Sequence, residues 1–273
     1  MGNNSIKSKL DKNTTISTIK LTLSADIDKK LCLIVVEGDD DQKFFKKFIA
    51  DNVYIYESYS GKEGVREIVN CPYINSDRVI GIRDKDYCKE SPTSKMFYYD
   101  FSCLEMMIIK DEEVCNALIS EFYDGDKSRD SLTICILKEL LPISLLRKRN
   151  EEESEGIRFH GLSINNIIAE DSSVSKSKLI DNLKKLNNER EFDIIFDEIY
   201  QQTFDEINLD DLLYVTNGHD FIHYFSVLCN RYRSTHICEK HISPCLRSAY
   251  DIRKFKKTNL YSEILKCNIN IFN

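Results

Sequence analysis

The sequence predicts an α/β protein in which a parallel-sheet domain is followed by a mainly helical domain. The run LCLIVV at residues 31–36 lacks polar alternation, which is typical of a strand buried on both faces of a parallel sheet. Strand-like and helix-like segments then alternate as far as residue 123, and helical spacing dominates beyond it. We therefore expect an N-terminal extension at 1–30, a sheet domain at 31–150 and a mainly helical domain at 151–273.

The expected sheet has four strands connected by helices. The acidic residues 39–41 open a segment whose apolar residues at 44, 45, 48 and 49 have helical spacing, and acids in a first turn suit the helix dipole. Further strands are expected at 53–59, 78–83 and 96–100, with helices at 62–70 and 103–123. This order predicts βαβ units with parallel strands.

The second half of the chain has mostly helical patterns. Helices are expected at 130–149, 175–189, 191–206 and 218–233, and residues 157–168 are left unassigned. The polar segment NEEESEG at 150–156 is the predicted linker, so we place the domain boundary there.

Composition limits the classes of protein to consider. The 273 residues are 42% hydrophobic and include ten cysteines without a CxxC pair. No apolar run is long enough to cross a membrane, and the first residues lack the apolar core of a signal peptide. We expect a soluble cytoplasmic protein with reduced thiols. The net charge is −7, but residues 229–273 carry nine Lys/Arg against three Asp/Glu, so this end is basic.

Three acidic residues follow two of the expected strands. Glu37 comes directly after the first strand, and Asp84 and Asp86 come after the third. Because the carboxyl ends of parallel strands meet at one edge of a sheet, these side chains are expected to lie together. Such carboxylates repel one another unless a cation neutralises them, and oxygen ligands without His or Cys favour one or two Mg²⁺ or Mn²⁺ ions. The pattern therefore predicts phosphoryl chemistry, with Lys85 offsetting charge.

A fourth acid stands out in the apolar stretch CLEMMII. Burying the Glu105 carboxylate there is costly unless it has a partner, so it is either a further metal ligand or one half of an ion pair. The three consecutive acids Asp39, Asp40 and Asp41 are instead interpreted as helix-start residues.

The order VVEGDDDQKFF, a spacer and VIGIRDKDY resembles the TOPRIM domain, which topoisomerases, bacterial primases and OLD-family nucleases share. The continuation FYYDFSCLEMMI and the later NGHDFIHYF are similar to small bacterial TOPRIM-like, OLD-related proteins encoded beside AAA or ABC-type ATPases. The TOPRIM effector of the PARIS anti-phage system is one of them. The resemblance covers residues 31–109, with a shorter likeness at 217–225.

This resemblance implies a site and an activity. Glu37 matches the TOPRIM glutamate, Asp84 and Asp86 match its DxD, and Glu105 matches the acid after the fourth strand. The implied activity is metal-dependent hydrolysis of nucleic-acid phosphodiesters, with tRNA or other RNA favoured and DNA as the alternative, by a toxic anti-phage effector that an ATPase partner restrains. Lys85 would help to stabilise the phosphate. Arg83 departs from the pattern, since many relatives have a small or apolar residue before the DxD.

Two other functions stay open. One alternative to a nuclease is a TOPRIM-shaped binding subunit of an ATPase complex with weak or lost catalysis. The other is a haloacid-dehalogenase-type phosphatase with the first Asp of GIRDKDY as nucleophile. The phosphatase interpretation fits less well, because Tyr87 and Cys88 stand where its motif has other residue types and Glu37 has no role in it.

Two basic runs are candidates for contacts with a phosphate backbone, with Phe255 or Tyr250 available for stacking; ordinary surface is the alternative. These runs consist of Arg147, Lys148, Arg149 and of Arg253, Lys254, Lys256, Lys257. His219 and His223 are expected to serve helix capping and core packing, and the His/Cys cluster at 236–245 has no trusted zinc spacing. Homodimerisation through the helical half is a further hypothesis.

Overall fold

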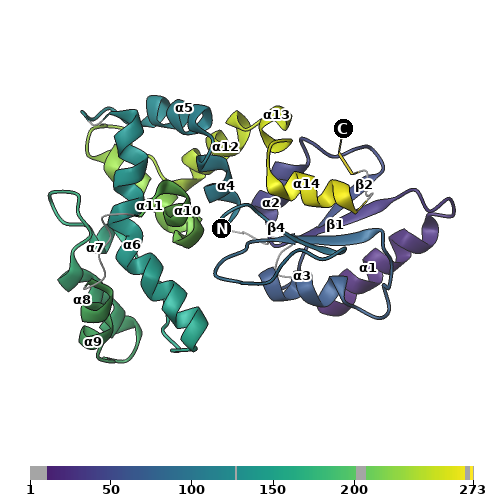
Figure 1. Ribbon diagram of the computed structural model, residues 1–273, viewed down its shortest axis with the longest axis horizontal. Coiled ribbons are helices and arrows are strands. Elements are labelled where there is room, and N and C mark those ends of the chain that lie inside the picture. Colours follow the sequence, from purple (N-terminus) through teal and green to yellow (C-terminus); the bar gives the residue numbers. More distant parts are fainter. Residues whose placement is uncertain (1–10, 127, 201–206, 268–270, 273) are drawn as a thin grey trace, which may run out of the picture. The chain divides into compact units, whose positions relative to one another are not determined.

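The computed structural model describes residues 11–126, 128–200, 207–267 and 271–272 (Figure 1). It confirms the α/β class, with a four-stranded parallel sheet and helices followed by a mainly helical region. The elements of the first part are α1 (Lys12–Ala25), β1 (Cys32–Val36), α2 (Asp39–Phe45), β2 (Val53–Glu57), α3 (Gly61–Val69), β3 (Val79–Arg83), β4 (Met96–Tyr98), α4 (Leu104–Ile109) and α5 (Glu112–Phe122).

The second part contains helices throughout its described residues. They are α6 (Arg129–Glu153), α7 (Ile164–Ile167), α8 (Lys176–Leu186), α9 (Asp193–Tyr200), α10 (Leu209–Val215), α11 (Gly218–Asn230), α12 (Glu239–Ala249), α13 (Ile252–Phe255) and α14 (Asn259–Lys266). The expected helix at 191–206 corresponds to α9, and residues 201–206 lie outside the described residues. No described helix has the length and apolar character needed to cross a membrane.

The chain divides into two compact units. Unit 1 holds the described residues of Met1–Lys85, Lys89–Asp100 and Asp251–Asn273, and unit 2 holds those of Asp86–Cys88 and Phe101–Tyr250. The expected boundary at 150–156 instead falls at the C-terminal end of α6, inside unit 2. The difference arises because the last segment of the chain packs with the sheet, which the local pattern around residue 150 does not reveal.

The sheet in unit 1 has the order β2-β1-β3-β4, and every pair of neighbours is parallel. All four strands predicted from the sequence are present. In β1, Ile34 is paired with Ile55 on one side and with Ile80 on the other, which explains the continuous apolar run. The central position of β1 beside β3 places the residues after these two strands at the same edge of the sheet.

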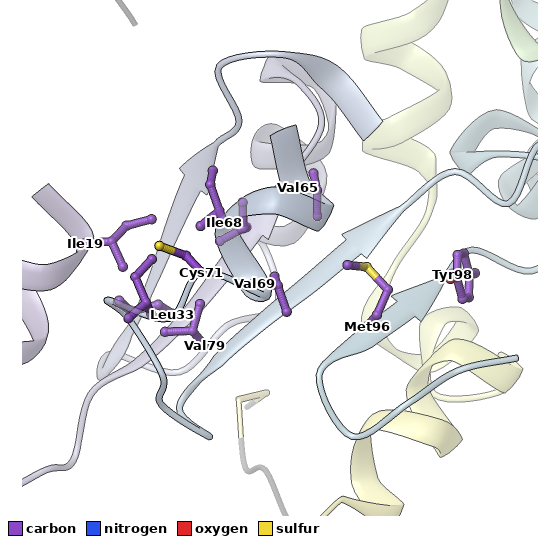
Figure 2. Packing of buried hydrophobic residues seen from close by; sticks show 11 residues of the cluster. Ile19, Leu33, Val65, Ile68, Val69, Cys71, Val79, Met96 and Tyr98 are labelled. Carbon is purple, nitrogen blue, oxygen red and sulfur yellow. The ribbon is translucent and has the colours of Figure 1, made fainter. Parts of the chain in front are cut away.

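Helices α1 and α3 cover one face of this sheet. Figure 2 shows Ile19 of α1 and Val65, Ile68 and Val69 of α3 directed toward strand residues such as Leu33. Side chains of α3 pack directly on the backbone of β3 at Gly81, where an added Cβ would lie 2.7 Å from Val65 Cγ1. The expected N-terminal extension therefore contributes a helix to the sheet domain.

An aromatic cluster covers the other face, where Figure 1 shows α2 and α14. Phe255 of α13 is its centre, with ring centroids 5.0–5.9 Å from its neighbours, which are Phe44, Phe45, Phe48, Tyr261 and Phe272. The end of the chain is also held by its backbone, since Ala50 N–H donates to Ile271 O at 3.0 Å. Residues 251–272 thus form part of the sheet domain.

Unit 2 is built around α6 and α11. Helix α6 contacts α5, α9, α10 and α11, while α11 also contacts α4, α7 and α12. The single helix expected at 103–123 is instead two, because Asp111 caps a new helix by accepting the Val114 N–H at 3.1 Å. The region that the sequence left unassigned contains α7.

Candidate functional site at the carboxyl edge of the sheet

Glu37 and Asp84 meet at the carboxyl edge of the sheet. They directly follow the neighbouring strands β1 and β3, and 47 positions separate them in the sequence. The backbone N–H of Asp84 donates to Glu37 Oε1 at 2.9 Å. The strand pairing therefore brings together two of the acids that the sequence singled out.

The other oxygen of Glu37 lies near the beginning of α3. A Cβ built on Gly61, the first residue of that helix, would be 3.8 Å from Glu37 Oε2. Gly61 has a φ of +47°, a conformation that favours glycine. The partial positive charge of a helix N-terminus therefore lies beside Glu37 Oε2.

A buried carboxylate–phenol pair, formed by Asp41 and Tyr99, lies on the face of the sheet that the aromatic cluster covers. Asp41 is 9% exposed, and its Oδ2 accepts the Gly38 N–H at 2.9 Å while its Oδ1 accepts the Tyr99 hydroxyl at 2.6 Å. Burial, followed by the charges of Asp41, Asp84 and Glu37, holds the pKa of Tyr99 well above its usual range. Three carboxylates therefore act electrostatically on one phenol.

The sequence did not identify the Asp41–Tyr99 pair. Asp41 was interpreted only as a helix-start acid, and the structure shows that it is one, at the third position of α2, but also that it is buried. The alternation of side chains along β4 indicates on which face Tyr99 lies, but not its partner. Because side chains alternate between faces, Phe97 and Tyr99 belong to the aromatic face, which here also contains the buried end of α2.

Replacing Tyr99 by phenylalanine is expected to flatten the decline in stability at alkaline pH. Since its folded-state pKa is raised, the contribution of Tyr99 is complete below about pH 10, its unfolded value, and is lost as the pH rises toward the folded value. The variant should also be less stable at pH 8 by about 1–3 kcal/mol, because Asp41 loses a buried donor. Urea unfolding at pH 8, 10 and 11 measures both effects.

The exposed Tyr54 provides the control, since Tyr54→Phe removes a phenol that has no buried partner among the described residues. An alkaline decline of the same slope in Tyr99→Phe and in the unmodified protein would contradict the assignment.

The remaining acids of the predicted site belong to unit 2. Asp86 has a φ of +46°, which Asp tolerates, and its N–H donates to Ser102 O at 2.7 Å. Glu105 lies beside Gly218, the first residue of α11, where an added Cβ would be 2.8 Å from Glu105 Cβ. Its carboxylate is thus placed at a helix N-terminus, a partner that the sequence analysis did not consider. Lys85 is half-buried and belongs to unit 1.

The donor set suits a hard cation but is small. Among the described residues, no group of three or more His, Cys, Asp or Glu side chains is arranged to hold a metal ion. Mg²⁺ is commonly held by one or two carboxylates, with waters and substrate phosphates as its other ligands. Glu37 and Asp84 offer two carboxylates without His or Cys, and the chemistry of this donor set is the kind that Mg²⁺ or Mn²⁺ prefers.

Arg83, which departs from the TOPRIM pattern, is directed toward a different set of residues. It is 6% exposed, its Nη2 lies 3.6 Å from Glu90 Oε2, and its guanidinium lies 5.3 Å from the centroid of the Tyr98 ring. Tyr98 belongs to the core on the α1 and α3 face, whereas Tyr99 belongs to the aromatic face. Arg83 therefore contributes to the packing of the first face.

The first basic run is occupied by ion pairs in unit 2. Arg147 donates to Asp220 through Nε at 2.8 Å and Nη2 at 3.1 Å, and it lies over the ring of Phe159 at 4.5 Å. Arg149 pairs with the acids Glu153, Glu155 and Glu198. Lys148 is half-buried.

The second basic run belongs to unit 1. Arg253 pairs with Asp251 and Lys254 is half-buried, while Lys256 and Lys257 are exposed. Phe255 and Tyr250 are both buried, so the expectation that they stack on bases is wrong. The exposed lysines keep their interpretation as candidate phosphate contacts.

The expectation that His219 and His223 serve helix capping and core packing is wrong. Asn217 caps α11 by accepting the Asp220 N–H, His219 is exposed, and His223 Nδ1 lies 3.4 Å from Glu239 Oε1. Capping at this helix therefore comes from Asn217.

No protein-family model matches the chain, and no curated protein shows significant similarity to it. The TOPRIM resemblance therefore rests on the sequence motifs described above and stays a prediction.

Proposed function

We propose that the protein is a Mg²⁺- or Mn²⁺-dependent nuclease of the TOPRIM type. The observation that carries the proposal is the hydrogen bond from Asp84 N–H to Glu37 Oε1, which unites the glutamate and the first aspartate of the motif at the carboxyl edge of a parallel sheet. Ligands of open α/β sheets bind at this edge. The sequence pattern in 31–109, resembling TOPRIM, supports the same activity.

Three residues of the chain would have different roles in the reaction. Glu37 and Asp84 would hold the cation and, with Glu37 as the candidate base, prepare a water for attack on phosphorus. Lys85 would offset charge on the phosphate. The cation, when bound, would supply electrostatic stabilisation of the attacking and leaving oxygens. Asp86 and Glu105 are further candidate ligands in the resemblance, and tRNA or other RNA is the favoured substrate, with DNA as the alternative.

Glu37→Gln and Asp84→Asn are each expected to lower metal-dependent cleavage at least about 100-fold, the scale of a lost acid–base group. Both replacements keep the size of the side chain, and Gln still accepts the Asp84 N–H. Cleavage of labelled tRNA, single-stranded RNA and duplex DNA with Mg²⁺, Mn²⁺ or EDTA measures the effect. Asp51→Asn, at an exposed position in unit 1, is the matched control.

If both variants kept full cleavage, or if EDTA did not abolish it, the proposal that these carboxylates act through a metal ion would be wrong. Circular dichroism melting of each variant separates loss of activity from loss of fold.

A binding subunit of an ATPase complex is the second candidate. Glu37 and Asp41 both accept backbone N–H groups, and Asp41 also accepts a buried phenol, which is how structural carboxylates are held. Under this alternative, Glu37→Gln and Asp84→Asn would keep both assembly with an AAA or ABC-type ATPase and the biological effect. A nuclease restrained by such a partner, as an anti-phage effector would be, would keep assembly alone.

A further inference from the structure

The C-terminal end of α10 joins two segments of unit 2 that lie far from it in the sequence. The last carbonyls of a helix have no partner within it. Here Leu213 O accepts the Ser102 N–H at 3.3 Å, and Thr216 O accepts the Ser102 hydroxyl at 2.5 Å. Val215 O accepts the Tyr87 hydroxyl at 3.2 Å, across 128 positions. The end of this helix therefore holds both segments.

These bonds fix the backbone of Asp86. Its own N–H donates to Ser102 O at 2.7 Å, and the next side chain in the sequence is that of Tyr87. Asp86 has a φ of +46°, and such a backbone persists in a residue other than glycine where neighbouring contacts hold it. Ser102 is 3% exposed and Thr216 is fully buried, so a group that loses its partner here stays unsatisfied. The backbone that carries the Asp86 carboxylate is therefore held by the end of α10.

The same part of the fold also contacts Glu105. Gly218 is the first residue of α11, and a Cβ added to it would lie 2.8 Å from both Glu105 Cβ and Cys103 Sγ. This contact is too close for a real side chain, so the glycine leaves the space that Glu105 occupies. Residues 213–218, which we call the α10–α11 junction, thus contact the surroundings of both acids that unit 2 contributes to the predicted site.

We propose that the α10–α11 junction holds Asp86 and Glu105 in place for the cation. Tyr87, Ser102 and Gly218 are its positioning residues. The inference rests on the proposed function, because the two acids have this role only in the metal-dependent nuclease. Groups that orient metal ligands through hydrogen bonds tune the site, and replacing one commonly lowers metal affinity or activity about 10- to 100-fold. All of these residues belong to unit 2, so the junction acts within one compact unit.

The test is Mn²⁺ binding by the full chain, followed by electron paramagnetic resonance. Tyr87→Phe and Ser102→Ala each remove one hydroxyl that donates to the junction, and each should weaken Mn²⁺ binding about 10- to 100-fold. Gly218→Ala should weaken it as well, because its new methyl group would displace Glu105. Amide hydrogen exchange at Asp86, measured without any cation, should become faster in the two hydroxyl variants.

Two matched controls remove the same kind of bond elsewhere in unit 2. Tyr224 is 2% exposed and its hydroxyl donates to a backbone carbonyl, so Tyr224→Phe matches Tyr87→Phe. Ser144 is fully buried and its hydroxyl donates to a backbone carbonyl at 2.9 Å, so Ser144→Ala matches Ser102→Ala. Each control should lower the melting temperature, as its counterpart does, but keep the Mn²⁺ affinity of the unmodified chain.

The outcomes separate this inference from the proposed function. If the unmodified chain binds Mn²⁺ and cuts labelled tRNA or duplex DNA, but each hydroxyl variant keeps the Mn²⁺ affinity of its control, the inference alone is wrong. If the unmodified chain neither binds Mn²⁺ nor cuts either substrate, the nuclease proposal is wrong and the inference falls with it. Weaker Mn²⁺ binding and faster exchange at Asp86 in the hydroxyl variants, and not in the controls, would support the junction as the positioning element.

Discussion

Replacing Phe255 by alanine is expected to lower the free energy of unfolding of unit 1 by about 3–5 kcal/mol. Phe255 is fully buried and contacts five aromatic rings from α2 and the residues after it, from α14 and from the last described residues. Alanine would leave a cavity that these rings cannot fill together, because three of them are fixed on the sheet side by α2 and the residues after it. Urea unfolding followed by tyrosine fluorescence measures the change.

Leu265→Ala is the control for that experiment, since Leu265 lies on α14 in the same segment but is 45% exposed. It should cost less than about 1 kcal/mol. Equal losses in both variants would show that the segment is not anchored through Phe255.

The second large effect is expected for Arg147→Ala, which should destabilise unit 2 by about 2–4 kcal/mol, somewhat below the usual cost of removing one partner of a buried ion pair. The Asp220 side chain is 9% exposed and would lose two hydrogen bonds from the guanidinium. The Arg147 side chain is 20% exposed, and the N-terminus of α11 still stabilises Asp220, so the cost is discounted. Thermal and urea unfolding measure it.

Two further variants separate charge from packing. Arg253→Ala removes an ion pair whose arginine is 85% exposed, and it should change stability by less than about 1 kcal/mol. Arg147→Lys keeps the charge but loses the two-pronged geometry, so it should fall between the extremes. If Arg147→Ala proved as mild as Arg253→Ala, the pair with Asp220 would not stabilise the unit.

The strands could be predicted because their signal is local. Leu33, Ile34 and Val35 are consecutive and fully buried, which is typical of a central parallel strand, and the positions of the acids after β1 and β3 followed from the same pattern. The pairing of Glu37 with Asp84 then required only that the two strands be neighbours.

The aromatic face and the division into units could not be predicted in this way. Phe255 lies in a short basic run whose pattern resembles ordinary surface, and its burial depends on rings more than 150 positions away, such as Phe44. Likewise, strand alternation assigns Tyr99 to a face of the sheet, but it does not show that Tyr99 will donate to Asp41, 58 positions away. Contacts of this kind are set by tertiary packing.

The return of residues 251–272 to the sheet has a consequence for synthesis of the protein. Asp100 accepts the N–H groups of Asn259 and Leu260. The residues Phe101–Tyr250 separate these partners in the sequence, so the strands and the segment that covers them are made at different times. On the ribosome, the face of the sheet that carries Tyr99 therefore has α2 on it but lacks α13 and α14 while unit 2 is made. Unit 1 is therefore completed only after unit 2 has been made, when the segment that follows Tyr250 joins the sheet.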